Sequence, residues 1–147
     1  HDALALLEIN PRHSQSHAEL FAWVDGVANH HHMVELALGR DPRPPHREGP
    51  YAVAAKWFVR RSTDGVVRRV PTPEEIAGVE RAVGGCVVEV KLTPGQRLSH
   101  RHDQDSYSYA IAQIHTGGTS EAELVAKYEQ AVAALPIEIE DVEERPA

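Results

Sequence analysis

Hydrophobic residues recur along the chain in two patterns, which predict an amino-terminal strand followed by a helix. A continuous apolar run from Ala3 to Ile9 predicts a buried strand, and Pro11 ends it because proline cannot donate to a strand ladder. From Ala18 to Leu38 hydrophobic residues recur mostly every three or four positions, which predicts a helix. Asp25 is placed as an N-cap within this segment and Gly39 as its C-terminal stop.

A loop rich in proline and glycine, GRDPRPPHREGP, follows this helix. Such a segment cannot continue a helix and is typical of a boundary between two layers. We therefore expect an amino-terminal part over residues 1–40, a linker over 41–50 and a carboxyl-terminal α+β subdomain over 51–147.

The first elements after the linker are predicted to be a hairpin and a short helix. Residues Tyr51 to Arg61 read as a strand, the sequence STDG supplies a turn, and Val66 to Val70 return antiparallel. Thr72 then caps a helix that has Pro73 at its first position and Glu75 as the second member of a capping box.

The last third of the chain predicts further strands and the clearest helix. Val87–Leu92 and Ser106–Ile114 alternate in polarity and read as strands, and 137–139 could add an edge strand. Ser120 and Glu123 form a capping box for a helix. One face of that helix is hydrophobic and carries Leu124, Tyr128, Ala131, Val132 and Leu135. The predicted fold class is α+β, with a mostly antiparallel sheet and flanking helices.

Composition limits the classes of partner. The net charge of −7 argues against a surface for nucleic acid, and no apolar run reaches the roughly 20 residues of a membrane span. Cys86 is the only cysteine, so no intrachain disulfide can form, which suits a reducing cytoplasm. Because the chain opens on His1 as though within a turn, we expect it to be the carboxyl-terminal piece of a longer protein.

Three polar residues at the end of the first predicted strand are the candidate site. Glu8, Asn10 and Arg12 stand at alternate positions, so a strand would point them the same way. A carboxylate and an amide oxygen are hard ligands that suit Mg²⁺, and a guanidinium binds phosphate or an anionic intermediate. By spacing alone, an ordinary solvated face is the commoner interpretation.

The sequence LLEINPR resembles the metal-binding signature of the ATP-grasp superfamily, Glu-x-Asn-Pro-Arg, as found in carbamoyl-phosphate synthetases and, with Thr for Pro, in biotin carboxylases. The similarity covers about the first forty residues, and the remainder resembles more loosely the carboxyl-terminal subdomain of biotin-carboxylase-like enzymes. The resemblance implies that Glu8 and Asn10 bind Mg²⁺ that bridges ATP phosphates, and that Arg12 stabilises charge on the phosphorylated carboxylate. Ser14 and Ser16 stand where biotin carboxylases carry a glutamine and a glutamate, so carboxylation of biotin is not expected.

The resemblance also implies partners. The family's glycine-rich phosphate loop, lysine, adenine-binding strand and further acidic ligand precede this motif, so we expect missing amino-terminal ATP-grasp domains to complete the site. The substrates would be ATP, a small-molecule carboxylate and a nucleophile such as an amine. The chain alone is predicted to be inactive, and a homodimer is compatible with the family.

Two other interpretations stay open. A histidine-based metal protein is suggested by the ten histidines, with His13, His17 and either His100 or His102 as ligands; His30, His31 and His32 cannot converge from one helix. A non-catalytic α+β binding or regulatory module is the other. The sequence HTGGTS at 115–120 could hold an anion before a helix, although a turn followed by a cap is the simpler interpretation.

Overall fold

The computed structural model describes residues 5–8, 15–102 and 107–142 and divides into two compact units. The first unit spans residues 1–50 and the second 51–147.

The first unit contains two short helices where the hydrophobic spacing predicted one. A 3₁₀ turn, η1 (Gln15–His17), leads into α1 (Ala18–Asp25), and α2 (His30–Ala37) follows. Gly26 adopts the left-handed backbone conformation, with φ of 90°. A right-handed helix cannot continue through a residue with positive φ, so α1 ends there. Asp25 is therefore the last residue of α1, and its predicted role as an N-cap is wrong.

The predicted stop at Gly39 is confirmed, since α2 ends in a Schellman arrangement. Gly39 has φ of 69°, and its N–H donates to the carbonyl of Leu36. The N–H of Arg40 donates to the carbonyl of Glu35 at 2.9 Å. Together these bonds satisfy carbonyl groups that the end of a helix leaves without partners.

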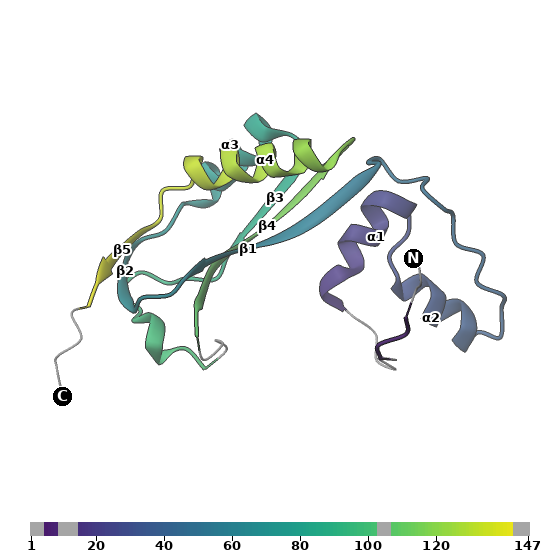
Figure 1. Ribbon diagram of the computed structural model, residues 1–147, viewed down its shortest axis with the longest axis horizontal. Helices are drawn as coiled ribbons and strands as arrows, with labels where there is room; N and C mark the ends of the chain where they lie inside the picture. The colour runs from purple at the N-terminus through teal and green to yellow at the C-terminus, as the bar shows by residue number, and fades with distance from the viewer. Residues whose placement is uncertain (1–4, 9–14, 103–106, 143–147) are drawn as a thin grey trace. The chain divides into compact units, whose positions relative to one another are not determined.

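The second unit is built on a three-stranded antiparallel sheet in the order β1-β4-β3 (Figure 1). The strands are β1 (Val53–Arg61), β3 (Cys86–Val90) and β4 (Tyr109–Gly118). The helices α3 (Pro73–Val83) and α4 (Glu121–Ala134) lie along one face of this sheet. The predicted α+β class, with a mostly antiparallel sheet and flanking helices, is confirmed.

The predicted hairpin is wrong. The strand β2 (Gly65–Arg69) pairs with β5 (Glu138–Asp141) in a second antiparallel sheet, while β1 pairs with β4. Asp64 accounts for the change of direction, since its carboxylate accepts hydrogen bonds from the backbone N–H groups of Gly65 and Ser99. The bond from Ser99 holds the turn beside the segment that follows β3. As a result, the chain after the turn does not run back along β1.

Two clusters of buried hydrophobic residues support the second unit. The larger lies between the helices and the three-stranded sheet, and Ile114 at its centre is fully buried. The smaller lies beside β2, with Leu98 of the 3₁₀ turn η2 (Leu98–His100) fully buried. Four of the five residues predicted for the hydrophobic face of α4 belong to or pack against the first cluster: Tyr128, Ala131, Val132 and Leu135. The fifth, Leu124, is also buried.

The cap of α3 forms as the sequence predicts. Thr72 and Glu75 form both bonds of the predicted capping box, with Pro73 at the first helical position. None of the helices in the described segments has the length and hydrophobicity that crossing a bilayer requires.

Candidate functional site

The segment that carries Glu8 is exposed rather than buried. Residues 5–8 belong to no helix or strand, and the side chains of Leu6 and Leu7 are 80% and 93% exposed. The prediction of a buried strand over 3–9 is therefore wrong for its described part, because these residues pack against no core. Glu8 is exposed to solvent, whereas Asn10 and Arg12 lie outside the described residues.

A cavity of about 510 Å³ opens beside α1 within the same unit. Its lining combines aliphatic and aromatic side chains with three polar ones: His17, Leu20, Phe21, Val24, Asp25 and Asn29. A cavity of this size and character can accept a small organic group and orient it with few hydrogen bonds. Apolar residues at helical spacing, such as Leu20 and Val24, predict a helix but not what covers its apolar face, so the sequence does not reveal the cavity.

The loop that follows α2 closes back onto the end of α1. The N–H of Arg47 donates to the Asp25 carboxylate at 3.0 Å, and the N–H of Gly49 donates to the Val24 carbonyl at 2.9 Å. A Cβ atom at Gly49 would stand 2.3 Å from the carbonyl oxygen of Trp23, so only glycine fits this approach. The proline-rich segment thereby orients Asp25 at the edge of the cavity.

The histidines do not form a metal centre in the part of the chain that the structure describes. No group of three His, Cys, Asp or Glu side chains there could hold an ion. His30, His31 and His32 fill the first turn of α2, and the ring of His32 bonds the carbonyl of Asn29. His13 lies outside the described residues, and His17 belongs to a different unit from His100 and His102.

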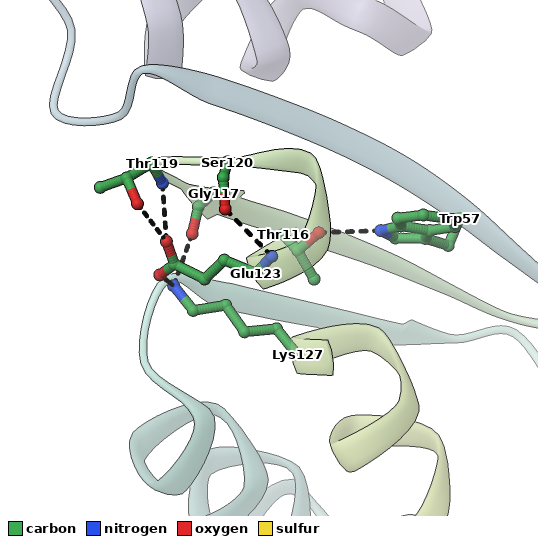
Figure 2. Close-up of polar contacts among 7 residues, drawn as sticks. All are labelled: Trp57, Thr116, Gly117, Thr119, Ser120, Glu123 and Lys127. Atoms are coloured by element: carbon green, nitrogen blue, oxygen red, sulfur yellow. Dashed lines mark hydrogen bonds and ion pairs between the residues drawn. The ribbon is translucent and has the colours of Figure 1, made fainter. Parts of the chain in front are cut away.

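The HTGGTS segment is not an anion site, because a carboxylate of the chain already occupies it (Figure 2). Its first four residues, through Gly118, belong to β4 rather than to a turn. The carboxylate of Glu123 accepts hydrogen bonds from both the N–H and the hydroxyl of Thr119, at 2.7 and 2.8 Å. Ser120 accepts the bond from the Glu123 N–H, so only half of the predicted capping box forms.

Lys127 completes this internal network. Its ammonium lies 2.8 Å from the Glu123 carboxylate and donates to the carbonyl of Gly117 at 2.6 Å. The bond from Lys127, followed by those from Thr119, lowers the pKa of Glu123 to about 2. The Glu123 carboxylate therefore stays ionised at neutral pH and repels an anion from the start of α4.

Two further ionisable groups in the second unit, Asp64 and Cys86, contribute to the fold and not to a reactive site. Desolvation alone would raise the pKa of Asp64, but hydrogen bonds led by Arg97 and Ser99 lower it to about 2. Burial, with a smaller effect from the charge of Glu80, raises the pKa of Cys86 to about 11, which keeps the thiol protonated and poorly nucleophilic.

A second cavity, of about 360 Å³, lies between α4 and the strands β1, β4 and β5. Its lining is aliphatic apart from Arg61, and the guanidinium of Arg61 already pairs with Asp141 and with the carbonyl of Thr63. This cavity offers little polar chemistry to orient a substrate.

Comparison with protein-family models, with curated proteins and with solved structures finds no match to the chain. The candidate site therefore depends on the amino-terminal motif and on the unit that carries it.

Proposed function

We propose that this chain is the carboxyl-terminal portion of a cytoplasmic ATP-grasp ligase and that it supplies one wall of the catalytic site. The observation that carries the proposal is the sequence Glu-x-Asn-Pro-Arg at residues 8–12. The exposure of Glu8 supports it, since a carboxylate that binds a metal and a nucleotide must be accessible.

The proposed reaction joins a carboxylate to an amine or a similar nucleophile. The carboxylate oxygen attacks the γ-phosphorus of ATP, which releases ADP and leaves an acyl phosphate. The nucleophile then attacks the acyl carbon, the carbon–oxygen bond to phosphate breaks, and the nucleophile loses a proton. Arg12 would stabilise the negative charge that develops on the acyl group.

The donor set at the motif suits Mg²⁺, because carboxylate and amide oxygens are the ligands that hard cations prefer. Glu8 and Asn10 are the residues that would hold the ion. When bound, Mg²⁺ neutralises charge on the polyphosphate.

The partner in this proposal is the amino-terminal part of an ATP-grasp enzyme. None of the described residues of the first unit is buried, and α2 and its C-cap expose four large apolar side chains. Those side chains, each about half or more exposed, are Met33, Val34, Leu36 and Leu38. Exposed apolar patches of this kind mark interaction surfaces, and we assign this one to the domains that carry the remaining nucleotide-binding residues.

The test compares Glu8→Gln with Glu129→Gln in the complete gene product, followed by ATP-dependent release of ADP. Glu8→Gln is expected to reduce turnover at least about a hundredfold, because it removes a charged metal ligand. Glu129 is exposed on α4, so its variant controls for the lost charge and should keep full activity.

A second measurement addresses the chain alone. Calorimetry with MgATP on residues 1–147 is expected to show no binding, since one wall of the site cannot hold the nucleotide. Tight binding by this chain, or full turnover by the Glu8→Gln variant, would contradict the proposal.

A further inference from the structure

The strand β1 has one paired edge and one outer edge. It stands at the end of the order β1-β4-β3, and among residues 5–8, 15–102 and 107–142 no strand pairs with its other side. β1 is nine residues long, which is enough to accept another extended segment. An edge of this length is a template for strand addition.

The sheet register identifies the backbone groups on that edge. The N–H of Gly117 donates to Gly85 at 2.8 Å, so Gly117 faces the β3 side and its neighbour Thr116 faces β1. Thr116 is the partner of Ala55, and alternate residues of a strand direct their backbone groups to opposite sides. Ala54 and Phe58 therefore direct their N–H and C=O groups to the outer edge.

A side chain protects the opposite edge of the sheet, on β3. The carboxylate of Glu80 accepts a hydrogen bond at 2.8 Å from the N–H of Val88, which lies on the outer side of β3. A side chain that caps an edge in this way discourages pairing with another strand. The β3 edge is therefore a poor template for a further strand.

The side chains on the outer face of β1 define the chemistry of that partner. Phe58 is 44% exposed, with the Lys56 ammonium 5.2 Å and the Arg60 guanidinium 5.4 Å from the centre of its ring. The intervening Trp57 and Val59 pack on the opposite face, in the core beneath the helices. Two cations therefore flank one aromatic ring on the face that the helices leave uncovered.

We propose that the outer edge of β1 binds an extended acidic segment of another protein, which adds to the sheet as a fourth, antiparallel strand. Its hydrophobic residue would lie against Phe58, and acidic residues two positions before and after it would face Lys56 and Arg60. Opposite charges directly across two strands stabilise their pairing, and so do aromatic pairs. Backbone bonds along the edge supply affinity, and the alternate side chains supply specificity.

A second copy of the chain fits this edge less well. Antiparallel pairing centred on Phe58 would set Lys56 against the partner's Arg60, and like charges directly opposite destabilise a strand pair. The proposal does not depend on the ligase assignment, because it uses residues of the second unit only.

The test uses a fluorescein-labelled peptide, GTEVFVETG, with the full chain and fluorescence polarisation as the readout. Replacement of both glutamates by lysine, as in GTKVFVKTG, is expected to weaken binding at least about tenfold through the two reversed charge pairs.

Two further peptides keep the acidic sequence and test the backbone hydrogen bonds. N-methylation of the phenylalanine and the first glutamate should weaken binding about tenfold or more, because their N–H groups face β1, whereas N-methylation of the two valines should change it less than about twofold.

Protein variants give a second, matched comparison. Lys56→Glu is expected to weaken binding of the acidic peptide about tenfold, and Arg81→Glu, which makes the same charge change at an exposed position of α3, should leave it unchanged. Circular dichroism checks that both variants are folded.

Three outcomes would overturn the proposal: no binding of GTEVFVETG up to about 1 mM, equal affinity for the two N-methylated peptides, or an equal loss of peptide affinity in the two protein variants. A dimer that Phe58→Asp dissociates would assign the edge to a second copy and would also overturn it.

Discussion

The two units of this chain differ in how they bury hydrophobic residues. The second unit encloses two clusters in which Ile114, Leu98 and Val67 are completely inaccessible to solvent. The first unit has helices of eight residues each, and neither contains a buried residue. Helices this short are marginal in water without tertiary packing, so the first unit is expected to be less stable than the second.

The two units therefore expose different kinds of surface, apolar side chains in the first and a strand edge in the second. In the first unit four apolar side chains in α2 and at its C-cap are about half or more exposed, and the proposed contact with another domain would cover them. In the second unit the core is complete, and the exposed chemistry lies on a strand edge with a charged face. An interaction with the first unit should stabilise it, whereas an interaction with β1 should leave the second unit's stability largely unchanged.

The strongest test of the contrast shortens one large aliphatic side chain in each unit. Ile114→Ala is expected to lower the free energy of unfolding of the second unit by about 2–5 kcal/mol, because it removes a fully buried side chain, whereas Leu36→Ala in α2 should cost less than about 0.5 kcal/mol. Urea denaturation can follow each unit separately, since Trp23 lies in α1 and Trp57 in β1. In a Trp23→Phe background the fluorescence reports the second unit, where Trp57 stacks on Tyr128. Equal losses from the two alanine variants would break the contrast.

A smaller effect is expected in acid, and it belongs to the second unit. The pKa of Asp64 is lowered from 3.8 to about 2, so its carboxylate stabilises the fold above about pH 4, and this stabilisation is lost as the pH falls through 2. Asp64→Asn should therefore reduce stability by about 1–2 kcal/mol at pH 6 and by much less at pH 2. Urea midpoints of the two proteins, measured through Trp57 across this range, should converge as the pH falls. A constant difference at every pH would show that the charge of Asp64 is not the cause.

The smallest effect is a gain in stability. Gly78 lies within α3, and a Cβ atom there would meet no atom within 4 Å. Gly78→Ala should stabilise the second unit by about 0.5–1 kcal/mol, because alanine loses less backbone entropy in a helix. The Trp57 transition should move to higher urea, while the signal of Trp23 in a Trp57→Phe background should not change. A shift of both signals would indicate that the two units unfold together.

Local patterns in the sequence predicted the helices of the second unit well. The capping box at Thr72 and Glu75, the proline at the start of α3 and the apolar face of α4 all depend on residues within a few positions of one another. Such interactions are short in range, so their residues can be recognised without knowledge of the fold.

The largest error falls where distant residues compete, whereas two smaller errors have local causes. The hairpin after Arg61 was predicted from an Asp-Gly turn, but Arg97 and Ser99, more than thirty positions away, hold the carboxylate of that aspartate. At the start of α4, Thr119 and Lys127 bind Glu123, so its carboxylate does not bond back to the N-cap. In the first unit the apolar spacing predicts one helix, whereas the helix ends at Gly26, which has a positive φ.

The sequence by itself determined the α+β class, most helix boundaries and the Glu-x-Asn-Pro-Arg motif on which the proposed activity depends, because each follows from neighbouring residues. Only the tertiary structure decided which strands pair, which apolar residues stay exposed and that β1 is left as an edge. Strand pairing joins residues far apart in the chain, and several partners satisfy the same alternation of polarity. The choice between them is made by long-range packing, which a local pattern does not contain.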